Sequence, residues 1–93
     1  MMRETFLEAA ILDYLTLRRI PAWRTHSARF PPVTPGVSDI IGILPGGRFL
    51  AVECKAPGGS CSSAQSAFIG TVRNAGGVAV LAYDLVDVVK LLS

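Results

Sequence analysis

Two short apolar segments joined by a tight turn restrict the fold of this chain more than any other feature. Residues 38–44 and 48–55 are mostly apolar, and Pro45, Gly46 and Gly47 stand between them. Segments of this length on either side of a proline–glycine turn are typical of an antiparallel β-hairpin. An isolated hairpin is unstable in water, so other parts of the chain have to cover its apolar faces.

The flanking segments supply that cover. Apolar periodicity and breaking residues predict the following elements: a helix at 4–18, a strand at 22–25, a proline-rich loop at 30–36, a helix that Ser62 or a neighbouring residue caps and that runs to 74, a strand at 78–83, and a helix that Asp84 caps and that ends at 92. The predicted order is α-β-β-β-α-β-α. Its strand–helix–strand crossover requires one parallel strand pair, so we expect an α/β fold with a mixed sheet flanked by helices.

Composition sets the scale of this fold. The chain has 93 residues, of which 51% are hydrophobic, which suits one domain (1–93) and excludes a disordered tail. Such apolarity is high for a small domain, so we expect part of the surface to lie in an oligomer contact. The last helix is apolar around most of its circumference and is the first candidate for a subunit interface.

Several classes of protein are excluded or disfavoured. No apolar run is long enough for a membrane span, and the N-terminus does not resemble a signal peptide. Cys54 and Cys61 match no zinc spacing, and two cysteines make no disulfide framework. Gly58 and Gly59 lack the ending of a phosphate-binding loop, so we expect no nucleotide cofactor. These features favour an intracellular, cytoplasmic protein with no membrane partner.

Three polar residues interrupt the hairpin. Glu53 and Lys55 share one face of the second strand, and the hairpin brings Asp39 to the same end. Two carboxylates, the backbone carbonyl of Cys54 and waters are ligands that Mg²⁺ or Mn²⁺ accepts, while Lys55 can orient a water or neutralise charge. The alternative is a surface ion network, since the spacing alone is a loose pattern.

The first predicted helix carries two further acids. Glu4 and Glu8 lie on one helical stripe with Ile11 and Leu15, so they extend the apolar face toward the same end of the sheet. The alternative is that both acids only favour the helix dipole in the first turns.

The cations are mostly arginine, seven of the nine, although the net charge is only +2. Arginine suits phosphate better than lysine does. Candidates for contacts with nucleic-acid phosphates are Arg18, Arg19, Arg24, Arg29 and His26. The alternatives are a solvated helix end and loop for the arginines and a solvated side chain for His26.

Four stretches together resemble a known family. They are PGVSDIIG at 35–42, VECKAPGG at 52–59, SSAQ at 62–65, and the helix–strand segment ETFLEAAILDYL to AWR within 4–24. The sequence resembles the VRR-NUC (virus-type replication-repair nuclease) branch of the PD-(D/E)XK nuclease superfamily over nearly the whole chain. The resemblance implies a restriction-endonuclease-like core. Ser38 departs from the proline of the name-giving motif, and His26-Ser27 stands where many relatives have an Asn-Ser-Gly turn.

The resemblance also implies roles for residues. Asp39 and Glu53 would be metal ligands and Lys55 the catalytic lysine, with Gln65 supporting the lysine or contacting phosphate. An acid on the first helix would complete the site as a further ligand. Family alignment favours Glu4 for that role and places Glu8 where a glutamine is usual, and both remain candidates.

A function follows as an expectation. The resemblance implies an Mg²⁺- or Mn²⁺-dependent endonuclease, and domains of this size resemble phage-encoded homodimers that act on branched DNA such as four-way (Holliday) junctions in repair. Two alternatives remain: a nuclease of the same chemistry that cuts flaps, nicks or duplex, and a non-catalytic DNA-binding module.

Overall fold

The computed structural model describes residues 4–27, 29 and 34–93, and the elements follow the predicted α-β-β-β-α-β-α order. The elements are α1 (Glu4–Leu17), β1 (Ala22–Arg24), β2 (Ile40–Ile43), the 3-10 turn η1 (Pro45–Gly47), β3 (Phe49–Cys54), α2 (Ser63–Asn74), β4 (Val78–Ala82) and α3 (Leu85–Leu92). Of the predicted loop at 30–36, residues 30–33 lie outside the described residues.

The strands form one mixed sheet in the order β1-β2-β3-β4. The pairs β1–β2 and β2–β3 are antiparallel, and β3–β4 is parallel, as the α2 crossover requires. The predicted hairpin strands are longer than the observed ones. Asp39 directly precedes β2 and Lys55 directly follows β3, so the polar residues lie where regular pairing ends.

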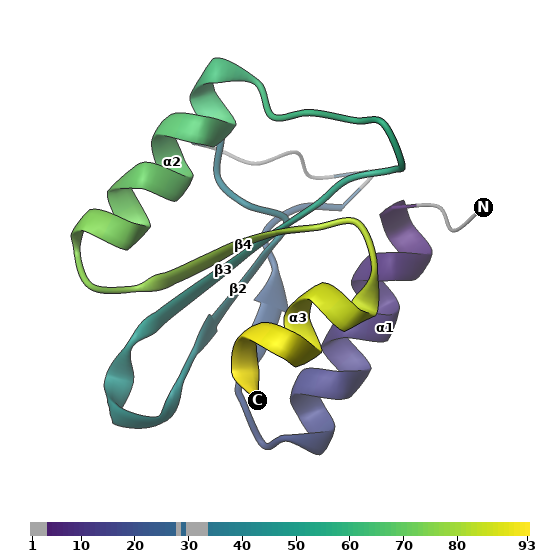
Figure 1. Cartoon of the computed structure of the whole chain (residues 1–93), viewed down its shortest axis with the longest axis vertical. Helices are drawn as coiled ribbons and strands as arrows, with labels where there is room; N and C mark the ends of the chain where they lie inside the picture. Colours follow the sequence, from purple (N-terminus) through teal and green to yellow (C-terminus); the bar gives the residue numbers. More distant parts are fainter. Residues whose placement is uncertain (1–3, 28, 30–33) are drawn as a thin grey trace.

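Two helical layers cover the sheet (Figure 1), with α1 and α3 on one face and α2 on the other. The larger core, between the sheet and α1 and α3, includes Leu50, Val52 and Cys54 of β3. The smaller core lies under α2 and includes Ala51 of the same strand. Strand β3 is therefore buried from both sides, and any polar group that it carries must find its partners inside the protein.

The turn between β2 and β3 explains its Pro-Gly-Gly sequence. Gly46 and Gly47 both have positive φ, 86° and 82°, a conformation in which side chains are strained. The Leu44 amide donates to the Arg48 carbonyl at 2.8 Å and closes the hairpin. The predicted tight turn is confirmed.

Helix α1 buries the stripe that its periodicity predicts. Leu7, Ile11 and Leu15 are almost fully buried, and Glu8 on the same stripe is only 6% exposed. Glu4, one turn earlier, is exposed. The two acids of this stripe therefore meet different environments.

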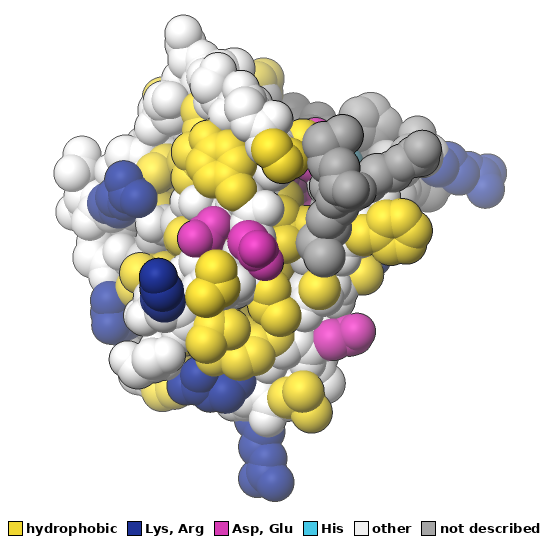
Figure 2. Space-filling view, turned by 45° about the vertical axis from the view of Figure 1, so that its right-hand side comes forward, with side chains coloured by type: hydrophobic (Ala, Val, Ile, Leu, Met, Phe, Trp, Pro, Cys, Tyr) yellow, Lys and Arg dark blue, Asp and Glu magenta, His cyan; other side chains and the backbone are white. Residues whose placement is uncertain are grey.

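Helix α3 is only partly covered. Val88 is buried, whereas Val86 and Leu91 are 46% and 43% exposed. Figure 2 shows hydrophobic side chains gathered over the face that α1 and α3 present, next to acidic and basic ones. Within the described part of the chain, no helix is both long and apolar enough to cross a bilayer.

The burial of α1 is testable with two leucines of the same helix. Leu15→Ala removes a side chain that is 0% exposed and is expected to lower the free energy of unfolding by about 2–5 kcal/mol. Leu17→Ala removes one that is 82% exposed and is expected to change it by less than about 0.5 kcal/mol. Urea unfolding followed by circular dichroism measures both values, and equal effects would contradict the packing of α1.

Candidate active site and metal centre

Asp39 is held at the junction of β2 and β3. The register pairs Ile40 with Val52, so Asp39 stands across from Glu53. One Asp39 oxygen, Oδ2, accepts a hydrogen bond of 2.8 Å from the backbone amide of Cys54. This bond fixes the Asp39 carboxylate over the last residues of β3. The second carboxylate oxygen, Oδ1, takes no part in it.

Glu53 is the most unusual group of this centre. Its side chain is 2% exposed, and its Oε1 atom has no hydrogen-bond partner among the described residues. Burial raises the pKa of Glu53 to about 8, and the neighbouring carboxyl of Asp39 contributes to the rise more than Lys55 lowers it. An uncompensated carboxylate oxygen in the interior is costly unless a proton or a cation neutralises it.

Lys55 and Gln65 complete this cluster from the other side. The Lys55 Nζ atom donates to Gln65 Oε1 at 2.9 Å and lies 3.8 Å from Glu53 Oε2. Gln65 Nε2 donates to the same Glu53 oxygen at 3.3 Å. The side chain of Lys55 is only 15% exposed, so its charge acts in a region of reduced solvent screening.

Gln65 is itself fixed by the start of α2. The Gln65 side-chain oxygen Oε1 accepts from the backbone amide of Ser62 at 2.9 Å. The backbone amide of Gln65 donates in return to Ser62 Oγ at 3.1 Å. This reciprocal capping box confirms Ser62 as the N-cap of α2. The cap therefore orients the glutamine that holds Lys55.

Of the two helix acids, Glu8 is the one inside the protein. Its Oε1 accepts from Arg24 Nε at 3.0 Å. Burial raises the pKa of Glu8, and the charge of Asp39 adds to the rise. Glu4 is exposed, although its charge still contributes to the raised pKa of Glu53. Of the two candidates for the ligand on the first helix, Glu8 therefore lies inside the acidic centre and Glu4 lies at its rim.

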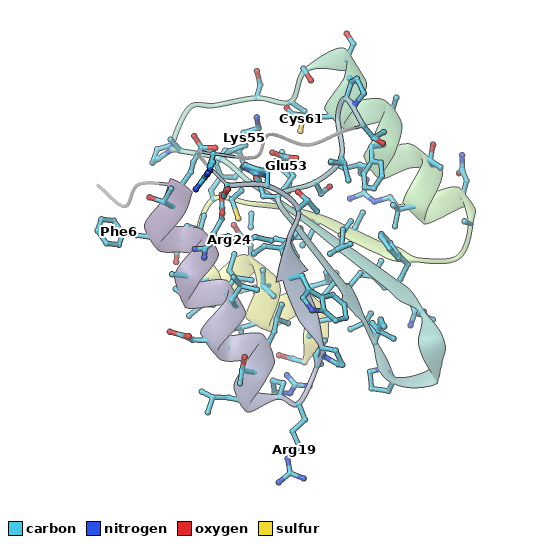
Figure 3. The ribbon with its side chains drawn as sticks, turned by 180° about the vertical axis from the view of Figure 1, so that it is seen from behind. Phe6, Arg19, Arg24, Glu53, Lys55 and Cys61 are labelled. Carbon is cyan, nitrogen blue, oxygen red and sulfur yellow. The ribbon has the colours of Figure 1, made fainter. Side chains whose placement is uncertain are left out.

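The predicted phosphate-binding residues are divided between the two ends of the molecule. Arg24 lies at the acidic end with Glu53 and Lys55, whereas Arg19 lies at the opposite end (Figure 3). Arg18, next to Arg19, donates to Tyr14 Oη and to the Leu92 carbonyl. Arg29 is exposed. Arg18 and Arg19 are therefore not brought to the acidic end.

His26 lies closer to the acids than its sequence context suggests. Its Nε2 atom is 3.6 Å from Asp39 Oδ1. The sequence predicted either a phosphate contact in an arginine-bearing segment or a solvated side chain, and not a neighbour of Asp39. The missed signal is the pairing of β1 with β2: Arg24 opposite Ile40 places the residues after β1 beside those before β2.

The donor set fits a hard divalent cation. Carboxylate oxygens of Asp39 and Glu53 converge, and the unpartnered Oε1 of Glu53 is an orphaned acceptor that a cation would satisfy. The thiol of Cys54 does not compete as a ligand, since it faces the core and burial raises its pKa. Of this residue only the backbone carbonyl remains a candidate ligand.

Comparison with known proteins agrees with this architecture. A family profile described as the VRR-NUC domain matches residues 3–83. A solved structure named "VRR_NUC domain protein" has a TM-score of 0.76 at 20% sequence identity, and the match covers 98% of this chain and 85% of that chain. At this identity the likeness shows the fold. No curated protein matches the sequence significantly.

The burial of Glu53 predicts how stability changes with pH. The folded-state pKa is raised to about 8 from an ordinary 4.5, so the folded chain binds the proton more tightly than the unfolded chain. The stabilising contribution is complete below about pH 4.5 and is lost as pH rises through about 8. We expect Glu53→Gln to remove a pH-dependent loss on the order of a few kcal/mol, measured by urea unfolding without metal.

Asp13→Asn is the matched control, because Asp13 is an exposed acid on α1 that lies outside the acidic centre. This variant should keep the pH dependence of the wild-type chain. If Glu53→Gln kept it as well, Glu53 would not be the group that titrates.

Proposed function

Because this chain belongs to the VRR-NUC domain family, it is a nuclease-type domain, and we propose that it is a divalent-metal-dependent DNA endonuclease. The observation that carries the proposal is the buried, unpartnered Oε1 of Glu53 beside Asp39, with Lys55 tied to the same cluster. A chain that only bound DNA would gain nothing from carboxylates that repel phosphate.

The proposed cofactor is Mg²⁺ or Mn²⁺, with Asp39, Glu53 and the Cys54 carbonyl as ligands. Glu8, which is buried, is better situated than the exposed Glu4 to complete the set. When bound, the ion would lower the pKa of a water and neutralise charge on the phosphate.

Lys55 has a separate task in this proposal. Its ammonium is held by Gln65 and faces Glu53, so it carries a fixed positive charge at the end of β3. A preorganised cation of this kind stabilises charge that develops on a phosphodiester during hydrolysis, and it also orients the attacking water. Gln65 acts through Lys55 and is a positioning residue.

The proposed substrate is DNA, and the finer proposal is branched DNA such as a four-way junction. Arg24 supports backbone contact near the acids, although it also pairs with Glu8. Arginine contacts with backbone phosphates would make binding depend on salt and little on sequence. The rival substrates are flaps, nicks and linear duplex.

A homodimer belongs to the same proposal, since paired cuts across a symmetric junction need two sites. Its support is exposed apolar surface in two places. One is α3, with Val86 and Leu91. The other is the β1–β2–β3 surface, where the large side chains of Trp23, Ile43 and Phe49 are 52%, 47% and 40% exposed.

The first test of this function is a cleavage assay with the two lysines of the chain. Labelled four-way junction, flap, nicked and linear duplex DNA are incubated with Mg²⁺, Mn²⁺ or EDTA. Lys55→Met is expected to lower the cleavage rate at least about 100-fold because it removes the fixed charge, with DNA binding retained.

Lys90→Met is the control, since Lys90 is exposed on α3, and its rate should equal that of the wild type. Symmetric cutting of the junction supports the substrate proposed here, and preferred cutting of flaps or duplex would replace it. Binding without cutting in either metal would leave the non-catalytic module.

The dimer is tested by measuring the mass of the chain in solution by light scattering. We expect twice the mass of one chain for the wild type. Val86→Lys or Ile43→Lys should give the monomer mass, according to which apolar surface is buried. A monomeric wild type at all concentrations would overturn the homodimer.

A further inference from the structure

A second set of potential ligands includes Asp39 but not Glu53. Ligand atoms of Glu8, His26 and Asp39 all lie within 4.8 Å of one another. Each residue comes from a different element: α1, the segment after β1, and the segment before β2. The cluster adds an imidazole nitrogen to a centre whose other proposed ligands are all oxygen atoms.

The histidine ring is held from behind. Its Nδ1 atom lies 3.4 Å from Thr25 Oγ1, and that hydroxyl donates to the Ser38 carbonyl at 2.7 Å. The hydroxyl therefore has its lone pairs left to accept from an Nδ1–H group. A histidine that donates from Nδ1 presents a bare lone pair at Nε2, which is the usual arrangement of a metal-binding imidazole.

That lone pair faces another electron-rich atom. The distance of 3.6 Å from Nε2 to Asp39 Oδ1 is too long for a direct hydrogen bond. Two atoms that share one octahedral ion, with bonds of about 2.1 Å, lie roughly 3 to 4.2 Å apart. Either a proton or a cation between Nε2 and Oδ1 would offset the repulsion of their lone pairs. Of the two, only a cation would also bind the nearby Glu8 carboxylate.

The buried side chain of Glu53 gives separate support for a cation near Asp39. Glu53 adjoins Asp39, is 2% exposed and has an Oε1 atom without a partner among the described residues. The Asp39 carboxylate therefore lies between an orphaned buried oxygen and a histidine nitrogen. The positive groups nearby face the outer carboxylates: Lys55 lies 3.8 Å from Glu53 Oε2, and Arg24 donates to Glu8 Oε1 at 3.0 Å.

Resting on the proposed metal-dependent function, we propose that His26 Nε2 is a direct metal ligand together with Glu8 and Asp39, and that it makes the centre prefer a transition-metal ion such as Mn²⁺ to Mg²⁺. Mg²⁺ favours oxygen ligands and keeps its waters, whereas first-row transition metals accept imidazole readily. Thr25 orients the ring for this contact.

The test uses Mn²⁺ as a magnetic probe of the untagged full chain. His26 is the only histidine in the sequence, so an imidazole nitrogen bound to Mn²⁺ has one source. Electron spin-echo envelope modulation is expected to show ¹⁴N coupling from a directly bound nitrogen. Labelling the chain with ¹⁵N-histidine should convert that signal without any substitution, so the result does not depend on a variant that folds.

Calorimetry supplies the second measurement. We expect His26→Asn to weaken Mn²⁺ binding about 10- to 100-fold and Mg²⁺ binding less than about threefold. Thr25→Val should produce a smaller loss in the same direction, because the ring loses its support but keeps its nitrogen. Circular dichroism verifies the fold of each variant.

The outcomes separate this inference from the proposed function. If Mn²⁺ binds and Asp39→Asn abolishes binding, but no histidine nitrogen couples, His26 is not a ligand and the metal-dependent function stands. If the wild-type chain binds neither ion, both fail. A histidine signal with unchanged preference between Mn²⁺ and Mg²⁺ would overturn the selectivity.

Discussion

The antiparallel pairing of β2 with β3 is the constraint on which the acidic centre depends. Because Ile40 pairs with Val52, Asp39 stands across from Glu53, and the Cys54 amide holds its carboxylate at 2.8 Å. A slip of one residue would turn every side chain of the strand to the other face and separate the two acids. The left-handed glycines of the Pro-Gly-Gly turn oppose such a slip, because they set the length and twist of the connection.

Burial on both faces of β3 gives the centre its electrostatic character. Leu50, Val52 and Cys54 fill one core and Ala51 the other, so Glu53 is carried into the interior by its neighbours. The strand stabilises the fold through these apolar side chains and holds one carboxylate where it is least stable. A raised pKa and an unpartnered oxygen are the results, so the buried carboxyl needs either a proton or a cation at this position.

The first turn of α2 holds the side chain of Lys55 in place. Ser62 and Gln65 cap the helix, and the same Gln65 oxygen accepts from Lys55. The segment before Asp39 is packed against this first turn: a Cβ on Gly36 would lie 2.3 Å from the Ala64 carbonyl oxygen. Close approach and positive φ both require glycine there. The ends of two strands and the start of one helix therefore form one unit.

The amino-acid sequence alone determined the order of elements, the hairpin, the capping of α2 and the convergence of Asp39, Glu53 and Lys55. These features depend on residues close in the chain, through turn chemistry, helix caps and the two-residue period of strands. Only the tertiary structure decided that Glu8 is buried while Glu4 is exposed, that His26 adjoins Asp39, and that Arg19 lies far from Arg24. The physical reason is that these placements follow from how α1 packs against the sheet and how β1 pairs with β2. Such contacts join residues distant in sequence, and no local periodicity encodes them.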